Sequence, residues 1–188
     1  MTTVLDLERQ AVAALRAGRF DEAERLADAA DSLDQQRRKP EPVEYATWYA
    51  SLQMPVFPLQ PGSKRPYPGS HGCKDATLDA EQVRAWWRAA PRSNIGIATG
   101  HNVDVIDLDG PDGVKAWLGD LWDQLPPIVA HARTIRPGGH HLYVAPTGAG
   151  NRARMVPGVD YRGAGGYVVA PGSTVDGRVY HWIKAPAL

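Results

Sequence analysis

The sequence of 188 residues contains a single cysteine, Cys73. One cysteine cannot form a disulfide within the chain, which excludes a small disulfide-stabilised scaffold and favours a reducing compartment. The sequence also has no apolar run near the ~20 residues needed to span a membrane. Its N-terminus carries acidic residues early and lacks the apolar core of a signal peptide. We therefore expect a soluble, cytoplasmic protein with no membrane partner.

The chain also lacks net charge, because its 21 lysines and arginines balance its 21 aspartates and glutamates. A neutral chain argues, on its face, against a nucleic-acid partner. The charges are unevenly distributed, however: residues 101–127 hold six acids and one base, and residues 128–188 hold two acids and seven bases. An acidic segment followed by a basic one suits a site that binds metal ions and also contacts phosphate. Ordinary fluctuation along the chain is the alternative.

The length and the apolar content of 43% allow one compact domain with a small appendage. Residues 1–40 have the pattern of two helices separated at Gly18 and are predicted to form a helical hairpin that packs against the domain or binds a partner. We expect Leu5 on its inner side and Asp21 as the N-cap of the second helix. Residues 43–188 are predicted to form the main domain.

The main domain is predicted to mix helices with strands. Helical patterns precede the strand expected at 56–59 and recur at 77–91 and 113–125. Further strands are expected within residues 94–100, 103–109, 128–136, 140–146, 158–163, 165–173 and 179–185. Strands with interspersed helices and hairpins are typical of an α+β domain.

Asp107 and Asp109 lie one residue apart at the end of the strand expected at 103–109. Side chains alternate along a strand, so both carboxylates point to one face while the residues between and before them point into the core. Like charges this close repel unless a cation lies between them. Oxygen ligands suit Mg²⁺ or Mn²⁺, and Asp160, beside Arg162, is the best candidate for a third ligand. A solvated strand end is the alternative for an isolated pair of this kind.

The same residues admit other functions. An apolar strand followed by Asp-x-Asp-Gly also opens haloacid-dehalogenase-type phosphatases, although Pro111 stands where that motif has threonine. A metal-dependent phosphohydrolase with Asp107 as nucleophile is therefore an alternative. A non-catalytic nucleic-acid-binding module is another. An EF-hand calcium loop is excluded, because proline and the missing closing glutamate break its spacing.

The segment "RPGGHHLYV" places two glycines before a pair of histidines. The glycines allow the backbone to pass close to a ligand. His141, at the start of the following strand, can donate a hydrogen bond to a phosphate and shares a strand face with Tyr143. A buried structural histidine is the alternative for either His140 or His141.

Five segments occur in a recognisable order: "PVFPLQPGSKRP", "DATLDAEQVRAWWRAAPRSNIGIATG", "VIDLDGPDG", "RPGGHHLYV" and "GVDYRGAGGYVVAPGS". Residues from about 43 to 183 resemble, through these segments, the bifunctional primase-polymerase (prim-pol) domains of the archaeo-eukaryotic primase superfamily. Such domains are common in replication proteins of plasmids, phages and integrated elements. Gly172 departs from the pattern, since many members have a second proline there.

The resemblance implies a two-lobed α+β fold with a catalytic sheet similar to an RNA-recognition motif. It implies a template-dependent nucleotidyltransferase, a DNA primase/polymerase, that uses two Mg²⁺ or Mn²⁺ ions. By this resemblance Asp107, Asp109 and Asp160 are the catalytic, metal-binding residues, and His141 and Arg162 contact the nucleotide.

Lys64 and Gly139 are also expected to bind the nucleotide, Lys64 as the weaker of the basic candidates. The implied partners are a DNA template and primer, a deoxynucleotide or ribonucleotide triphosphate, and a helicase domain or protein. Four arginines are candidates for contact with the template backbone: Arg133, Arg136, Arg152 and Arg154.

Overall fold

The structure, a computed structural model, describes residues 3–34, 40–116 and 126–186. The helices in these ranges are α1 (Val4–Arg16), α2 (Phe20–Asp34), α3 (Pro42–Ser51), α4 (Ala80–Ala89) and α5 (Gly110–Ala116), with a 3₁₀ turn, η1 (Gly72–Asp75). The strands are β1 (Val56–Leu59), β2 (Asn94–Ala98), β3 (Asp104–Leu108), β4 (Ile128–Arg133), β5 (His140–Val144), β6 (Arg152–Val156), β7 (Val159–Arg162), β8 (Tyr167–Val169), β9 (Thr174–Val175), β10 (Arg178–Val179) and β11 (His181–Lys184). The mixed α+β composition predicted from the sequence is confirmed.

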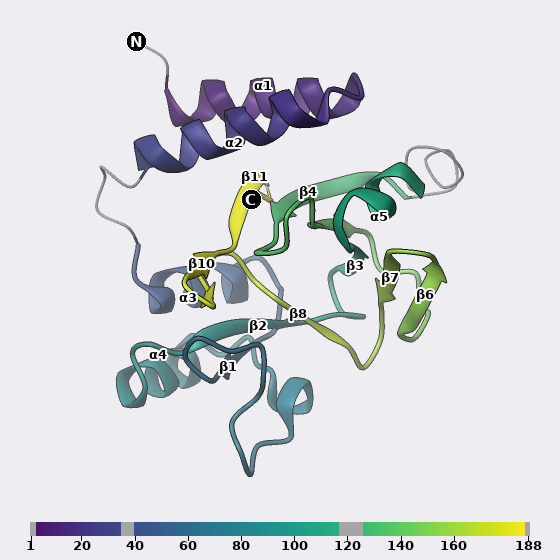
Figure 1. Cartoon of the computed structure of the whole chain (residues 1–188). Coiled ribbons are helices and arrows are strands. Elements are labelled where there is room, and N and C mark those ends of the chain that lie inside the picture. Colours follow the sequence, from purple (N-terminus) through teal and green to yellow (C-terminus); the bar gives the residue numbers. More distant parts are fainter. Residues whose placement is uncertain (1–2, 35–39, 117–125, 187–188) are drawn as a thin grey trace.

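Two antiparallel sheets organise the main domain. The smaller has the order β1-β2-β8, and the larger has the order β11-β4-β5-β3-β7-β6. Helices α3 and α4 lie against the smaller sheet, whereas α5 lies beside the larger one (Figure 1). Strands β9 and β10 form a separate short hairpin.

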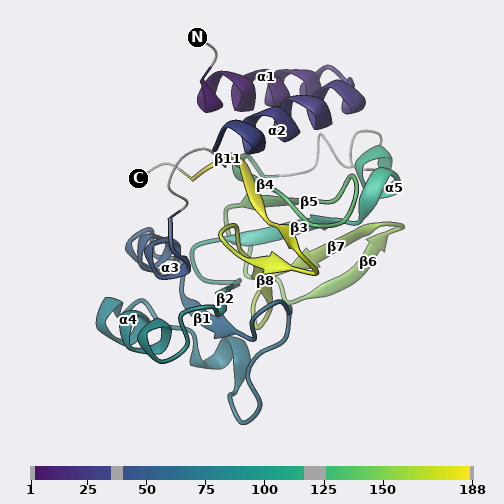
Figure 2. The same cartoon turned by 60° about the vertical axis from the view of Figure 1, so that its left-hand side comes forward.

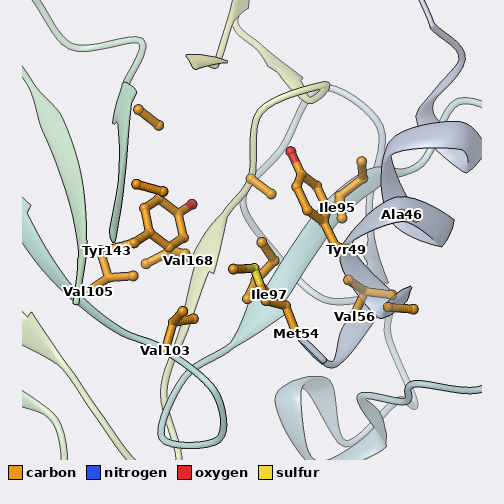
Figure 3. Packing of buried hydrophobic residues seen from close by; sticks show 14 of the residues in the cluster. Ala46, Tyr49, Met54, Val56, Ile95, Ile97, Val103, Val105, Tyr143 and Val168 are labelled. Carbon is orange, nitrogen blue, oxygen red and sulfur yellow. The ribbon is translucent and has the colours of Figure 1, made fainter. Parts of the chain in front are cut away.

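The main hydrophobic core lies between the two sheets. Val105 and Tyr143 of the larger sheet pack in one cluster with Ile95 and Ile97 of the smaller sheet and with Tyr49 of α3 (Figure 3). All five side chains are fully buried, and burying a side chain of this size contributes about 1.5–3 kcal/mol. The two sheets are therefore held together by a shared core.

The larger sheet is also covered on its other face. Ile106, Leu108 and Leu142 point away from the main core and pack with Val114 of α5 in a second cluster. Strand β3 is thus buried on both faces along most of its length, and its position is strongly fixed. This rigidity matters because β3 carries Asp107.

The predicted helical hairpin is present, and Gly18 adopts a positive φ of 72° just after the end of α1, as a glycine at that position allows. Two details were wrong. Helix α2 begins at Phe20, so Asp21 lies in its first turn instead of at the N-cap. The side chain of Leu5 is 53% exposed, because the buried stripe of α1 runs through Leu7, Ala11, Ala14 and Leu15.

The hairpin packs on β11 and β4 (Figures 1 and 2). Ile183 of β11 joins the buried alanines and Leu15 of the hairpin in one cluster. The guanidinium of Arg133 in β4 lies 2.6 Å from Asp28 and 3.3 Å from Glu24, both in α2. Arg133 therefore uses its charge to hold the hairpin.

Several of the other predicted helices and strands are present in the structure, which also contains strands that were not predicted. The strand predicted at 56–59 matches β1, and the N-cap of α4 is Asp79, one of the two residues expected there. Strands β6 and β9 were not predicted. The tryptophans at 117 and 122 and most of the helix expected at 113–125 lie outside the described residues. Within the described residues, no helix is both long and apolar enough to cross a membrane.

Gly172 shows why the sequence departs from the pattern of a second proline. Its φ is +90°, which the proline ring cannot adopt. A Cβ atom there would lie 2.5 Å from the ring of Tyr45. The close packing of this turn against α3 therefore requires glycine.

Candidate functional site

Three of the predicted site residues form a row across the larger sheet. In the register of β5, β3 and β7, Asp107 lies directly opposite His141 on one side and directly opposite Asp160 on the other. Directly opposed residues of antiparallel strands point to the same face. The Nε2 atom of His141 lies 3.5 Å from Oδ1 of Asp107. The structure thus brings together three residues that are up to 53 positions apart in the sequence.

Asp109 follows β3 on the same side of the strand. Its N–H group donates to the carbonyl of Gly158, at 2.7 Å, in the turn between β6 and β7. That turn approaches α5 closely: a Cβ atom on Gly158 would lie 2.6 Å from the nitrogen of Gly113. The glycines therefore let the two segments meet and fix the backbone of Asp109.

A guanidinium group lies between the two opposed carboxylates. Nη2 of Arg162 is 2.7 Å from Oδ2 of Asp160 and 3.6 Å from Oδ2 of Asp107. The other oxygen of Asp160 accepts a hydrogen bond of 2.7 Å from the N–H group of Arg154 in β6. The repulsion expected between neighbouring carboxylates is thus relieved by Arg162, a cation supplied by the protein.

Asp109 has a guanidinium partner of its own. Nη1 of Arg136, in the turn between β4 and β5, lies 2.9 Å from Oδ1 of Asp109. The turn is tight, because a Cβ atom on Gly139 would lie 2.3 Å from the hydroxyl oxygen of Thr134. The packing of the turn itself therefore accounts for Gly139, and a role for Gly139 in nucleotide binding stays a prediction.

The carboxylates of the site differ in their electrostatics. Burial raises the pKa of Asp107, but the charges of His141 and Arg162 outweigh it, and the net pKa lies below the usual value. Burial and the negative charge of Asp107 raise the pKa of Asp109, more than the charge of Arg136 lowers it. Asp160 also raises the pKa of Asp109, so the three carboxylates lie within electrostatic reach of one another.

His141 lies in an aromatic environment that sequence reasoning missed in part. Its ring lies 6.4 Å from that of Tyr143 and 5.8 Å from that of Tyr180, between centroids. Tyr180 is buried, and burial and the nearby charge of Asp107 raise its pKa. The Nδ1 atom of His141 is buried without a hydrogen-bond partner in the described part of the chain. Tyr180 follows the two residues of β10, and no pattern in the sequence marks it as part of the site.

Lys64 lies in the loop that follows β1 of the smaller sheet. Its positive charge lowers the pKa values of both Asp107 and Asp109, so its ammonium group lies within electrostatic reach of the carboxylates. Its carbonyl accepts a hydrogen bond of 3.1 Å from the hydroxyl of Tyr167. The loop thus adds a positive charge to the surroundings of the row.

The donor chemistry of the site suits a hard divalent cation, because its ligand candidates are three carboxylates. In their present positions, however, no three His, Cys, Asp or Glu side chains of the described residues are grouped closely enough to hold a metal ion. Arg162 and Arg136 contact the carboxylates instead. The three carboxylates could therefore bind a metal ion once the guanidinium groups of Arg162 and Arg136 move away from them.

The fold and the row on β5, β3 and β7 define an α+β protein whose site combines carboxylates with arginines and a histidine. Residues 46–188 match the Prim-Pol family, described as the N-terminal domain of bifunctional DNA primase/polymerase, and the chain belongs to this family. Membership implies DNA primase/polymerase activity in DNA replication. The predicted resemblance is confirmed, and the match begins within α3, which leaves α1 and α2 outside it. A search of curated proteins finds no match to the chain.

Proposed function

We propose that the protein is a template-dependent nucleotidyltransferase that uses two divalent metal ions, Mg²⁺ or Mn²⁺, in the replication of a plasmid, phage or mobile element. The observation that supports this most directly is the row of His141, Asp107 and Asp160 on one face of the larger sheet. The two sheets would then be the two lobes of a primase-type fold. The larger one would be the catalytic sheet that resembles an RNA-recognition motif.

Asp107, Asp109 and Asp160 would hold the metal ions. Bound at such a site, two ions stabilise the charge on the attacking and leaving oxygens of nucleotidyl transfer. The attacking oxygen is the primer 3′-hydroxyl, which forms a bond to the α-phosphate as pyrophosphate leaves. The carboxylates of Asp107 and Asp160 are less than a fifth exposed at 18% and 17%, which keeps water from competing for them.

The basic residues beside the row would bind the triphosphate. Arg162 presents a planar fork that matches phosphate oxygens, and His141 lies directly opposite Asp107 on the neighbouring strand. Lys64 would add a third positive charge from the opposite side. Negative charge on a triphosphate is thereby placed next to the carboxylates that hold the ions.

Primer extension tests the proposal. Asp107→Asn removes a ligand charge without changing side-chain size and should abolish Mn²⁺-dependent extension of a primed template, a loss of at least about 100-fold. The matched control is Asp112→Asn, because Asp112 is an exposed aspartate on α5 and is not one of the residues of the row. The control should extend the primer as the unsubstituted protein does.

The same assay separates the alternatives. Release of inorganic phosphate from the nucleotide without new strands would identify a phosphohydrolase with Asp107 as nucleophile. Binding of the template with neither extension nor phosphate release would identify a nucleic-acid-binding module. Undiminished extension by Asp107→Asn would refute the assignment of Asp107.

A further inference from the structure

Each carboxylate of the site contacts a guanidinium group. Arg162 bridges Asp160 and Asp107, and Arg136 pairs with Asp109. The two arginines come from different elements, β7 and the turn between β4 and β5. Every acid of the site thus has a positively charged partner that the protein itself supplies.

We propose that Arg162 and Arg136 are exchangeable counter-ions, which leave the carboxylates for the triphosphate when a nucleotide binds and so open the carboxylates to divalent cations. The inference rests on the proposed function and adds to it a coupling between two ligands. Nucleotide and metal ions then bind cooperatively, and the metal-binding state of the site forms only when the triphosphate is present.

The position of Arg162 supports the exchange. Its Nη2 atom lies between two carboxylate oxygens, which is where a cation relieves their repulsion best. A divalent ion and the guanidinium therefore compete for the same oxygens. Phosphate offers a guanidinium the same bidentate geometry as a carboxylate and a larger negative charge.

The position of Arg136 supports it as well. Its side chain is 56% exposed and that of Asp109 is 39% exposed, so the ion pair between them is weak and can open at little cost. Main-chain hydrogen bonds hold the turn that carries Arg136, including one from Gly139 to the carbonyl of Arg136 itself. The guanidinium can therefore move while its backbone stays in place.

Coupling follows from mass action. An arginine that must leave before a metal ion binds lowers the metal affinity of the nucleotide-free protein, and a nucleotide that removes the arginine restores it. Linkage requires the reverse effect of equal size, in which metal ions strengthen nucleotide binding. The proposal therefore predicts that substitution of either arginine strengthens the binding of metal ions to the nucleotide-free protein and weakens the binding of the nucleotide.

The first measurement is Mn²⁺ binding to the nucleotide-free protein, followed by the loss of the electron paramagnetic resonance signal of free Mn²⁺. Arg162→Gln should tighten Mn²⁺ binding roughly tenfold, because it frees two partly buried carboxylates. Arg136→Gln should tighten it about two- to fivefold. Thermal unfolding followed by circular dichroism checks that each variant folds, and Arg136→Gln keeps the test decisive should Arg162→Gln fail to fold.

Lys64→Gln is the matched control. It also removes one positive charge that acts on Asp107 and Asp109, but no contact between Lys64 and either carboxylate is observed in the described residues. Loss of long-range charge alone should change Mn²⁺ affinity less than about twofold in physiological salt. If Arg162→Gln and Lys64→Gln changed Mn²⁺ affinity equally, the proposed exchange would be wrong, and the loss of one positive charge would explain both effects.

The second measurement is nucleotide binding in EDTA, followed by the anisotropy of a fluorescent deoxynucleotide triphosphate. Arg162→Gln and Arg136→Gln should each weaken it, because the guanidinium groups are triphosphate ligands in the exchanged state. Unchanged nucleotide affinity in both variants would overturn the proposal.

The outcomes separate this inference from the proposed function. Should the unsubstituted protein bind Mn²⁺ in a way that Asp107→Asn abolishes, while neither arginine variant binds it more tightly, the metal site stands and the exchange fails. Should no saturable Mn²⁺ binding occur in any of the proteins, with or without nucleotide, the proposed metal-dependent function fails and the inference fails with it.

Discussion

His141 depends on its neighbours for its orientation in the site. The side chain is buried at 5% exposure near the rings of Tyr143 and Tyr180, and its Nε2 atom lies 3.5 Å from Asp107. A ring held in this way can present a fixed N–H group to a phosphate placed beside Asp107. Tyr180, whose ring centroid lies 5.8 Å from that of His141, thus contributes to the site although no contact with a ligand is required of it.

His141→Gln should weaken nucleotide binding about tenfold and leave DNA binding within about twofold, because one charge-assisted hydrogen bond to phosphate is worth 1.5–3 kcal/mol. Fluorescence anisotropy with a labelled nucleotide and with a labelled primed template measures the two affinities. His101→Gln, at an exposed loop position, is the control. Equal losses of both affinities would instead indicate a general structural role for His141.

At the scale of single residues, the sequence predicted which acids lie together and missed what pairs with them. Alternation along a strand placed Asp107 and Asp109 on one face without further information. The resemblance selected Asp160, and strand register, which no local pattern encodes, then places it opposite Asp107. Arg136 was predicted only as a candidate for contact with the template, and its ion pair with Asp109, at 2.9 Å, depends on a tertiary contact that no local pattern reveals.

Strand β6 is the edge of the larger sheet and lies next to β7, which carries Asp160. Residues 152–155 are all exposed, and the register with β7 is irregular between Arg152 and Val156. Among the described residues, neither Arg152 nor Arg154 forms an ion pair. Of the four arginines considered for template contact, these two keep their charges available beside the site.

We predict that Arg152→Gln/Arg154→Gln weakens binding to a primed template and lowers the slope of log affinity against log salt concentration by roughly 1 to 2, the contribution of two phosphate contacts. The control is Arg84→Gln/Arg88→Gln on the exposed side of α4, which removes the same charge far along the chain from β6. Titrations at several salt concentrations, followed by anisotropy, measure both slopes. A slope that matches the unsubstituted protein would exclude β6 as a template contact.

Among the helices and strands, those with strong local sequence patterns were predicted correctly, whereas those with weak patterns were missed. Strand β1 and helix α4 were predicted well, because prolines, a capping aspartate and a buried tryptophan mark their positions. Strand β6 was missed, since "RARMV" is exposed and has no apolar alternation. Its pairing with β7 is a tertiary effect that intrinsic propensity does not reveal.

At the scale of the whole molecule, the hairpin of α1 and α2 is joined to the main domain through β4 and β11. The contacts are the ion pairs of Arg133 and the packing of Ile183 on small residues of the hairpin. The helical pattern of residues 1–40 predicted the two helices but not which strands they cover. The expected division between residues 1–40 and 43–188 stays a prediction.

Two histidines, the buried His131 and the half-buried His140, lie where β4 and β5 face the hairpin. The ring nitrogens Nε2 of His131 and Nδ1 of His140 are 3.0 Å apart, and His140 lies with Arg133 and residues of α2 around a cavity of about 490 Å³. Burial, with the charges of Arg133 and His141, lowers the pKa of His140 to about 4. Burial, and the repulsion that would arise if His131 and the neighbouring His140 were both protonated, lower the pKa of His131 well below its usual value. Both rings are therefore neutral in the folded protein at pH 7.

The pKa values predict how stability depends on pH. Below about pH 6.5 the unfolded chain binds protons at both histidines and the folded chain does not, so the free energy of unfolding decreases as the pH decreases toward about 4. His140 alone accounts for a loss of about 2 kcal/mol between pH 7.5 and pH 5. Urea unfolding at the two pH values measures the loss. His131→Asn/His140→Asn should reduce it, whereas His101→Asn, at an exposed position, should not. An equal loss in the double variant would show that groups other than these two histidines cause the loss of stability in this range, and it would contradict the prediction.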